Sequence, residues 1–315
     1  TQSRSSAASD VYKRQVLEAS EIDSGYPLDA SSNGFERINL AKAFSAKVTL
    51  SEDGSTITAI SFGAKAPIVV KTASSKDTIT GLLTDFNEYY VAGKGVTDEG
   101  KSVLVHDDQL TEDINNKAYG TDGNTAQDQR ALSDAQMNST NTLYDALGPV
   151  LGKYYKDAAD AGKLPKTAQF LSDMNKSAST GVAKATYQHP RPYVDRVNFN
   201  GTTLNMNGLK QTLNIKKVPG YENFDWGDGE APDNEYDGLY NSGSFPSGHT
   251  TFAFTQGAGL AYLLPELGPE IMTRVSEAGN NRIVLGVHYP LDIMGGHIAG
   301  QYGVATAVSG EKLSL

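Results

Sequence analysis

Residues 247–264 of the chain, SGHTTFAFTQGAGLAYLL, contain its longest apolar neighbourhood and decide its fold. The apolar part, residues 250–264, is shorter than the roughly 18–20 apolar residues that a membrane-spanning helix needs, and Thr, Gln and Gly interrupt it. We therefore expect a helix buried in a folded core, and no membrane span.

Helical periodicity, with apolar residues three and four positions apart, extends from this stretch along most of the chain. Pro265 and Pro290 mark helix boundaries downstream, and the helix before His189-Pro190 must stop there because a residue preceding proline avoids the helical conformation. The predicted helices are residues 78–91, 124–155, 165–184, 247–264, 269–285 and 290–308.

Two regions lack this period. Residues 46–72 alternate apolar and polar positions around Asp53-Gly54, which predicts a β-hairpin. Residues 193–245 contain Asn-Gly turn signals, and an acidic stretch at 222–237 that we interpret as a solvated loop. The expected fold class is therefore mainly α, a helical bundle decorated by small β-hairpins.

We divide the chain into three parts on this basis. Residues 1–18 fit nothing downstream, and we expect them to be disordered or a non-native leader. Residues 19–75 form an N-terminal extension with the β-hairpin. Residues 76–315 form the helical domain, with a loop and hairpin excursion at 193–245.

Composition and charge exclude several classes of protein. The 315 residues include 27 Lys and Arg against 37 Asp and Glu, so the formal charge is −10, the wrong sign for a nucleic-acid binder or for a protein held on an anionic membrane. The absence of cysteine excludes disulfides, thiolate metal sites and cysteine nucleophiles. An anion-binding site must then be a local concentration of positive charge.

Three short segments supply such a concentration together with groups that can move protons. They contain a lysine, two arginines, a serine hydroxyl, a glycine N–H, two histidines and an aspartate, namely Lys184, Arg191, Ser247, Gly248, His249, Arg282, His288 and Asp292. Phosphoryl transfer requires mainly positive charge around the phosphoryl oxygens, and arginine can bind two of them at once. A helix that starts at Ser247 would add its N-terminal amides.

The remaining groups suit the proton transfers. An imidazole that a carboxylate holds in one tautomer is a competent nucleophile, and His288 with Asp292 four residues later is such a pair. The second imidazole, His249, could protonate the leaving oxygen. His106 has no such neighbours in sequence, and we expect it on the surface.

These segments resemble the signature of the superfamily that joins type 2 phosphatidic acid phosphatases, bacterial class A non-specific acid phosphatases and vanadium-dependent haloperoxidases. The signature reads K-x6-R-P, P-S-G-H and S-R-x5-H-x3-D, and its counterparts here are residues 184–192, 246–249 and 281–292. The resemblance covers residues 165–308. One position departs from it, since Asn281 replaces the serine, and its amide could still donate to an anion or orient Arg282.

The resemblance implies a helical bundle of the acid phosphatase and haloperoxidase type. It also implies that His288 becomes phosphorylated or ligates vanadate, that His249 is the general acid and that Asp292 orients His288. The implied oxyanion cradle comprises Lys184, Arg191, Ser247, Gly248 and Arg282. We place Asn281 and His189 as possible second-layer residues, and Tyr221 and Trp226 as residues that could contact substrate.

The expected function is that of a soluble, vanadate-sensitive acid phosphatase that hydrolyses a small-molecule phosphate monoester, with no resident cofactor or metal. A vanadium-dependent haloperoxidase, with vanadate as its cofactor in the same pocket, is the alternative, and a non-catalytic phosphate-binding surface protein is a third reading. By resemblance to the bacterial acid phosphatases, we expect a secreted, periplasmic or cell-surface location. The leaving group and the oligomeric state stay open.

Overall fold

The computed structural model describes residues 46–50, 57–62, 68–69, 78–137, 143–221 and 235–308. The chain divides into two compact units, Thr1–Gly81 and Leu82–Leu315. The predicted leader, residues 1–18, lies outside the described residues. No helix within the described ranges combines the length and the apolar character that crossing a membrane would require.

The first unit contains a small antiparallel sheet. Its strands are β1 (Ala46–Leu50), β2 (Ile57–Phe62) and β3 (Ile68–Val69), in the order β1-β2-β3. β1 and β2 pair in antiparallel register from Ala46 opposite Phe62, which confirms the predicted hairpin. Its Asp53-Gly54 turn lies outside the described residues.

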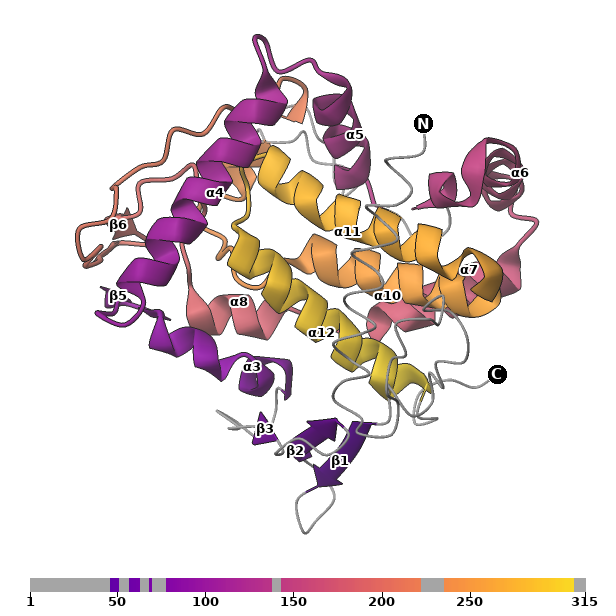
Figure 1. Ribbon diagram of the computed structural model, residues 1–315, viewed down its shortest axis with the longest axis horizontal. Coiled ribbons are helices and arrows are strands. Elements are labelled where there is room, and N and C mark those ends of the chain that lie inside the picture. Colours follow the sequence, from indigo (N-terminus) through magenta and orange to yellow (C-terminus); the bar gives the residue numbers. More distant parts are fainter. Residues whose placement is uncertain are drawn as a thin grey trace, which may run out of the picture. The chain divides into compact units, whose positions relative to one another are not determined.

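Three long helices form the centre of the second unit: α10 (Gly248–Leu263), α11 (Gly268–Val284) and α12 (Pro290–Val308). They run side by side in Figure 1, and α10 contacts both of the others as well as α7 (Pro165–Lys176).

Glycines on α10 and α12 allow this close packing. A Cβ atom on Gly257 would come 2.1 Å from Val275 of α11, and one on Gly300 would come 2.8 Å from Phe254. Residues 250–260 are therefore part of a largely buried helix, as predicted, whereas Tyr262 and Leu263 in its last turn are exposed.

The other described helices of the second unit surround this centre. Pro residues begin α6 and α7, and a capping box between Thr125 and Asp128 begins α5. These helices and short 3-10 turns are η1 (Thr84–Glu88), α4 (Lys101–Tyr119), α5 (Ala126–Ala135), η2 (Tyr144–Leu147), α6 (Gly148–Asp160), α8 (Gly181–Tyr187), α9 (Glu235–Gly238) and η4 (Pro265–Leu267). The short helix α3 (Thr78–Leu82) falls at the boundary, with Thr78–Gly81 in the first unit.

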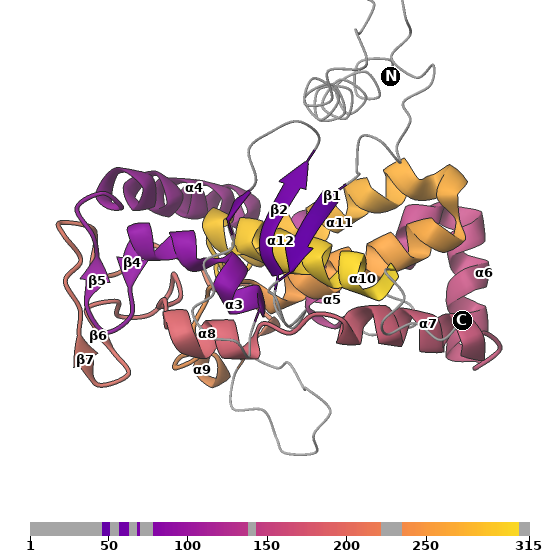
Figure 2. The same cartoon turned by 90° about the horizontal axis from the view of Figure 1, so that it is seen from below.

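Short hairpins lie at one end of the second unit and α6 lies at the other, as both views show (Figures 1 and 2). The hairpins pair β4 (Tyr90–Val91) with β5 (Gly95–Val96), and β6 (Asn198–Phe199) with β7 (Thr202–Thr203). The second hairpin and α9 fall within the predicted excursion at 193–245. The mainly helical fold with small hairpin decorations is thus confirmed.

Three predicted helices are divided in the structure. Residues 78–91 form α3, η1 and β4, and residues 124–155 contain α5, η2 and the start of α6. Residues 165–184 form α7 and part of α8, because the Ser-rich turn at 177–180 interrupts the helix. The Ser177 hydroxyl donates to the Met174 carbonyl, and this turn packs against Gly303 of α12.

No sequence pattern indicated the helix α4. Leu104 is the one apolar residue on its buried face, where an amphipathic helix normally carries mostly apolar residues; the others are Asp107, Asp108, Thr111, Glu112 and Asn115. The apolar periodicity of α4 is therefore weak. His106, on the same helix, is exposed as expected.

Candidate active site

His288 and Asp292 form a buried pair where α11 leads into α12. His288 lies in the loop between the two helices, and Asp292 lies in the first turn of α12. The Nδ1 atom of His288 is 3.0 Å from Oδ2 of Asp292. Both side chains are at most 2% exposed, so little water competes for this hydrogen bond.

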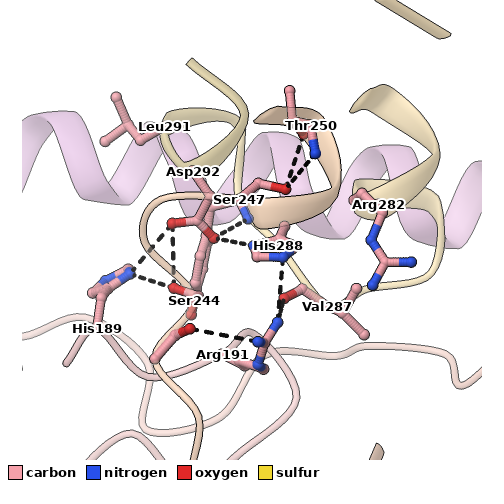
Figure 3. Close-up of polar contacts among 12 residues, drawn as sticks. His189, Arg191, Ser244, Ser247, Thr250, Arg282, Val287, His288, Leu291 and Asp292 are labelled. Atoms are coloured by element: carbon pink, nitrogen blue, oxygen red, sulfur yellow. Dashed lines mark hydrogen bonds and ion pairs between the residues drawn. The ribbon is translucent and has the colours of Figure 1, made fainter. Parts of the chain in front are cut away.

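Arg191 contacts the other edge of the His288 ring. Its Nη1 atom lies 3.3 Å from Nε2 of His288 (Figure 3). A guanidinium can only donate and a carboxylate can only accept. The neutral imidazole must therefore carry its proton on Nδ1, toward Asp292, and present its lone pair at Nε2.

Further donors hold the Asp292 carboxylate. Oδ2 also accepts the Tyr289 backbone N–H at 2.9 Å, and Oδ1 accepts the Ser244 hydroxyl at 3.2 Å. His189 Nδ1 donates to the Ser244 oxygen at 3.0 Å and lies 3.9 Å from Oδ1 of Asp292. Burial alone would raise the pKa of Asp292, but hydrogen bonding with His189 and His288 lowers it below its usual range.

His189 thus contacts Ser244 and lies beside Asp292 without contacting His288 directly in the contacts described above. Ser244 was not among the predicted site residues. Its only sequence signal is its position two residues before Pro246, at the edge of the second motif.

Two of the predicted cradle cations are anchored by backbone carbonyls. Lys184 Nζ donates to the carbonyls of Gly243 and Ser244 at 2.8 and 2.9 Å. Arg191 donates from Nε to the Ser242 carbonyl and from Nη1 to the Val287 carbonyl, each at 3.0 Å. Burial lowers the pKa of both groups, and neighbouring arginines lower that of Lys184 further.

Arg282 is the third cation, and two of its nitrogen atoms have no hydrogen-bond partner. Its Nη2 donates to the Tyr221 hydroxyl at 2.8 Å, and the guanidinium lies 5.7 Å from the centre of the Tyr221 ring. Its Nε and Nη1 atoms are buried and have no hydrogen-bond partner. Unpaired buried donors are costly, so the geometry favours an acceptor between them. Trp226 lies outside the described residues.

Ser247, Gly248 and His249 begin α10. Ser247 caps the helix, since its Oγ accepts the Thr250 N–H at 3.3 Å and the Thr250 hydroxyl at 2.9 Å (Figure 3). It retains its own O–H as a donor. A Cβ on Gly248 would lie 3.1 Å from Thr180 Oγ1 and 3.9 Å from Lys184 Cε, which places this backbone beside the lysine.

His249 faces α5. Its Nε2 lies 3.1 Å from the Ala135 carbonyl, which can only accept, so Nε2 carries a proton. Burial and then the charge of Arg282 lower the pKa of His249 well below its usual value. Burial likewise lowers the pKa of His288, outweighing its hydrogen bond to Asp292.

The side chain of Asn281 contacts α5. Its Nδ2 donates to Asp134 Oδ2 at 2.6 Å, and its Oδ1 accepts from Gln127. Asp134 is paired in turn with Arg274. The amide that replaces the expected serine therefore connects α11 to α5, the helix whose last residue holds His249.

The balance of charge favours an anionic ligand. Lys184, Arg191 and Arg282, when protonated, outnumber the single carboxylate of Asp292 by two charges. A phosphate monoester carries nearly two negative charges at neutral pH. Within the described part of the chain, this site included, no group of three or more His, Asp or Glu side chains has an arrangement that could hold a metal ion.

This helical fold and its cation-rich histidine site define the class of protein. Residues 168–310 match the family model of the PAP2 superfamily. The match encloses all eight residues predicted for catalysis and phosphate binding.

Two bacterial proteins illustrate the similarity. The chain is 27% identical over 189 residues to a non-specific acid phosphatase of Providencia stuartii, which covers 58% of this chain and 61% of that protein. It is 40% identical over 62 residues to an acid phosphatase of Zymomonas mobilis, over 20% of this chain and 24% of the relative. The matched part of the chain thus spans about three fifths and about a quarter of their lengths.

Proposed function

We propose that this protein is an acid phosphatase that hydrolyses phosphate monoesters through a phosphohistidine on His288. The observation that carries the proposal is the orientation of His288, whose Nδ1 contacts Asp292 while Nε2 faces Arg191. The similarity to two proteins named acid phosphatase supports the same activity.

Binding of the phosphoryl group uses the excess positive charge. Its oxygens pair with Lys184, Arg191 and the two unpartnered donors of Arg282, and the N-terminal amides of α10 add further donors. Arg191 exchanges its contact with Nε2 of His288 for a phosphoryl oxygen. This exchange releases the lone pair of the nucleophile.

The reaction then takes two displacements. In the first, His288 Nε2 forms a bond to phosphorus, the bond to the leaving oxygen breaks, and His249 gives that oxygen a proton. In the second, His249 takes a proton from water as the water oxygen bonds to phosphorus and the nitrogen–phosphorus bond breaks. Asp292 stabilises the imidazolium character of His288 throughout.

The test is hydrolysis of p-nitrophenyl phosphate between about pH 4 and 9 in EDTA, with and without orthovanadate. His288→Ala is the informative variant and His106→Ala the matched control, since His106 is an exposed histidine on α4. We expect turnover by the wild type and the control, inhibition by vanadate, and a loss of at least about 1,000-fold in His288→Ala.

Two results would contradict the proposal. One is undiminished turnover in His288→Ala, and the other is no turnover by the wild type. In the second case the haloperoxidase alternative is tested by bromide oxidation after loading with vanadate. Mass spectrometry after an alkaline quench, which preserves phosphohistidine, tests the covalent intermediate on His288 directly.

A further inference from the structure

A buried carboxyl group on α4 contacts the helix turn that carries Asp292. Asp107 is 4% exposed, and its Oδ1 accepts the backbone N–H of Leu291 at 3.0 Å. Leu291 is the neighbour of Asp292 in the first turn of α12 (Figure 3). The Oδ2 atom of Asp107 is buried and has no hydrogen-bond partner.

This contact replaces a missing helix cap. The first N–H groups of a helix have no partner within it, and a side chain immediately before the helix usually accepts one of them. Tyr289 occupies that place in α12 and has no suitable side-chain acceptor. Two carboxyl groups cap the helix instead: Asp292 accepts the Tyr289 N–H, and Asp107 accepts the Leu291 N–H.

The charged groups around Asp107 would not neutralise it if it ionised beside Asp292. They are Asp292 on α12, Asp108 on α4, and Arg196 on the segment after α8. Arg196 forms a two-point ion pair with Asp108, in which Nη1 and Nη2 donate to Oδ1 and Oδ2 at 2.7 and 3.0 Å. Two close carboxylates resist ionising together, and Asp292 has the hydrogen bonds that favour its anion.

Asp107 is therefore the carboxyl group that stays protonated. Burial and then the charge of Asp292 raise the pKa of Asp107 to about 8, while the Leu291 N–H only partly opposes them.

We propose that Asp107 is a positioning residue, which as a neutral carboxyl group fixes the first turn of α12 so that Asp292 alone bears negative charge beside His288. The inference rests on the proposed function, and it concerns a helix outside residues 168–310, the part that matches the superfamily. Ionisation of Asp107 sets a second negative charge against Asp292 and disturbs its alignment with His288. Ionisation of Asp107 thus adds to the loss of activity above about pH 8, beyond the loss that deprotonation of His249 causes.

Three substitutions on α4 separate this role from a purely structural one. Asp107→Asn keeps an acceptor for the Leu291 N–H and cannot ionise. Asp107→Leu removes the acceptor. Asp113→Asn is the matched control, since Asp113 is exposed on the same helix. For each protein, kcat and KM for p-nitrophenyl phosphate and the Tm are measured from about pH 5 to 9.5.

The Asn variant carries the pH prediction. Below pH 7 we expect its kcat within about twofold of the wild type, and by pH 9.5 we expect the ratio of variant to wild-type kcat to have risen at least about fivefold. Asp107→Leu should lose about tenfold or more in kcat at every pH with little change in KM, since the helix turn has lost its acceptor. Asp113→Asn should follow the wild type throughout.

The Tm comparison needs no turnover, so it separates failure of this inference from failure of the proposed function. A carboxyl whose pKa is higher in the folded than in the unfolded protein costs the wild type stability as pH rises from about 4 to 8. Asp107→Asn cannot ionise and does not lose this stability. The difference in Tm between this variant and the wild type should therefore increase over that range and then level off.

Three outcomes would overturn the inference. They are a pH-independent ratio of Asp107→Asn to wild-type kcat, an Asn variant as impaired at pH 5.5 as the Leu variant, and a Tm difference that does not change with pH. If Asp107→Leu does not fold, the comparison of Asp107→Asn with the wild type decides by itself.

Discussion

The Nδ1 atom of His288 lies 3.0 Å from Oδ2 of Asp292, and the opposite ring nitrogen faces Arg191 at 3.3 Å. One partner accepts and the other donates, so a single tautomer satisfies both contacts. The same carboxylate also accepts from Ser244 and from the Tyr289 N–H. Arg191, the Ser244 hydroxyl and the Tyr289 N–H are thus three donors, from three parts of the chain, that together fix one imidazole and its carboxylate.

Asp292→Asn tests this relationship. The amide can donate to Nδ1 and so stabilise the tautomer whose Nε2 is protonated and cannot attack phosphorus. We expect kcat to fall by about 100- to 10,000-fold, with vanadate binding within about threefold of the wild type. Steady-state kinetics and calorimetric titration with vanadate measure the two quantities. A kcat within twofold of the wild type would contradict the role of Asp292.

Arg282→Lys tests the unpartnered donors. A lysine cannot contact the Tyr221 hydroxyl and also present two fixed donors, so we expect vanadate inhibition to weaken by about 10- to 100-fold. Arg130→Lys is the matched control, because Arg130 pairs with Asp145 and Glu277 at a partly exposed position. Equal inhibition constants in the two variants would argue against anion binding by Arg282.

The lowered histidine pKa values predict an acid optimum. Neutral His288 is required for attack, and its lowered pKa keeps it neutral into the acid range. His249 must be protonated to act as an acid, and its lowered pKa restricts that form to low pH in the free enzyme. A bound dianion opposes the charge of Arg282 and raises the pKa of His249 again.

The pH profiles should therefore be bell-shaped, with an optimum below about pH 6.5 and with the alkaline limb of kcat at higher pH than that of kcat/KM. His249→Ala should lose at least about tenfold more activity on an alkyl phosphate than on p-nitrophenyl phosphate, whose leaving group needs little protonation. Equal losses on both substrates, or a profile flat from about pH 4 to 9, would refute the assignment of His249.

Asn281→Ser tests the departure from the superfamily motif. The shorter side chain loses its bond to Asp134 and leaves that buried carboxylate with one donor fewer. We expect the free energy of unfolding to fall by about 1–2 kcal/mol, while kcat/KM changes less than about threefold. Urea denaturation and steady-state kinetics give the two values. A large loss of phosphate affinity without loss of stability would instead place Asn281 against the substrate.

Much of the site could be predicted because its signals are local. His288 and Asp292 are four residues apart, and Ser247 caps the helix that Gly248 begins. The spacing within the three motif segments indicated which residues belong to the site. The apolar composition of residues 250–264 likewise sufficed to predict a largely buried helix, although its last turn is exposed at Tyr262 and Leu263.

The supporting residues gave no such signal. Ser244 lies in a loop, the Ala135 carbonyl that holds His249 has no side chain to reveal it, and Asp107 belongs to a helix whose buried face is polar. A method that searches for apolar periodicity misses α4, because its carboxyl groups are buried by pairing and capping rather than by contact with a hydrophobic core.

The sequence by itself therefore determined the helical class, the three motif segments and the chemistry of their side chains, because each depends on residues close together along the chain. Only the tertiary structure decided which nitrogen of His288 faces the cations, which donors of Arg282 stay unpaired, and which carboxyl group contacts α12. Asp107 and Leu291 are 184 residues apart, so their contact arises from the packing of α4 against α12 and from no local pattern.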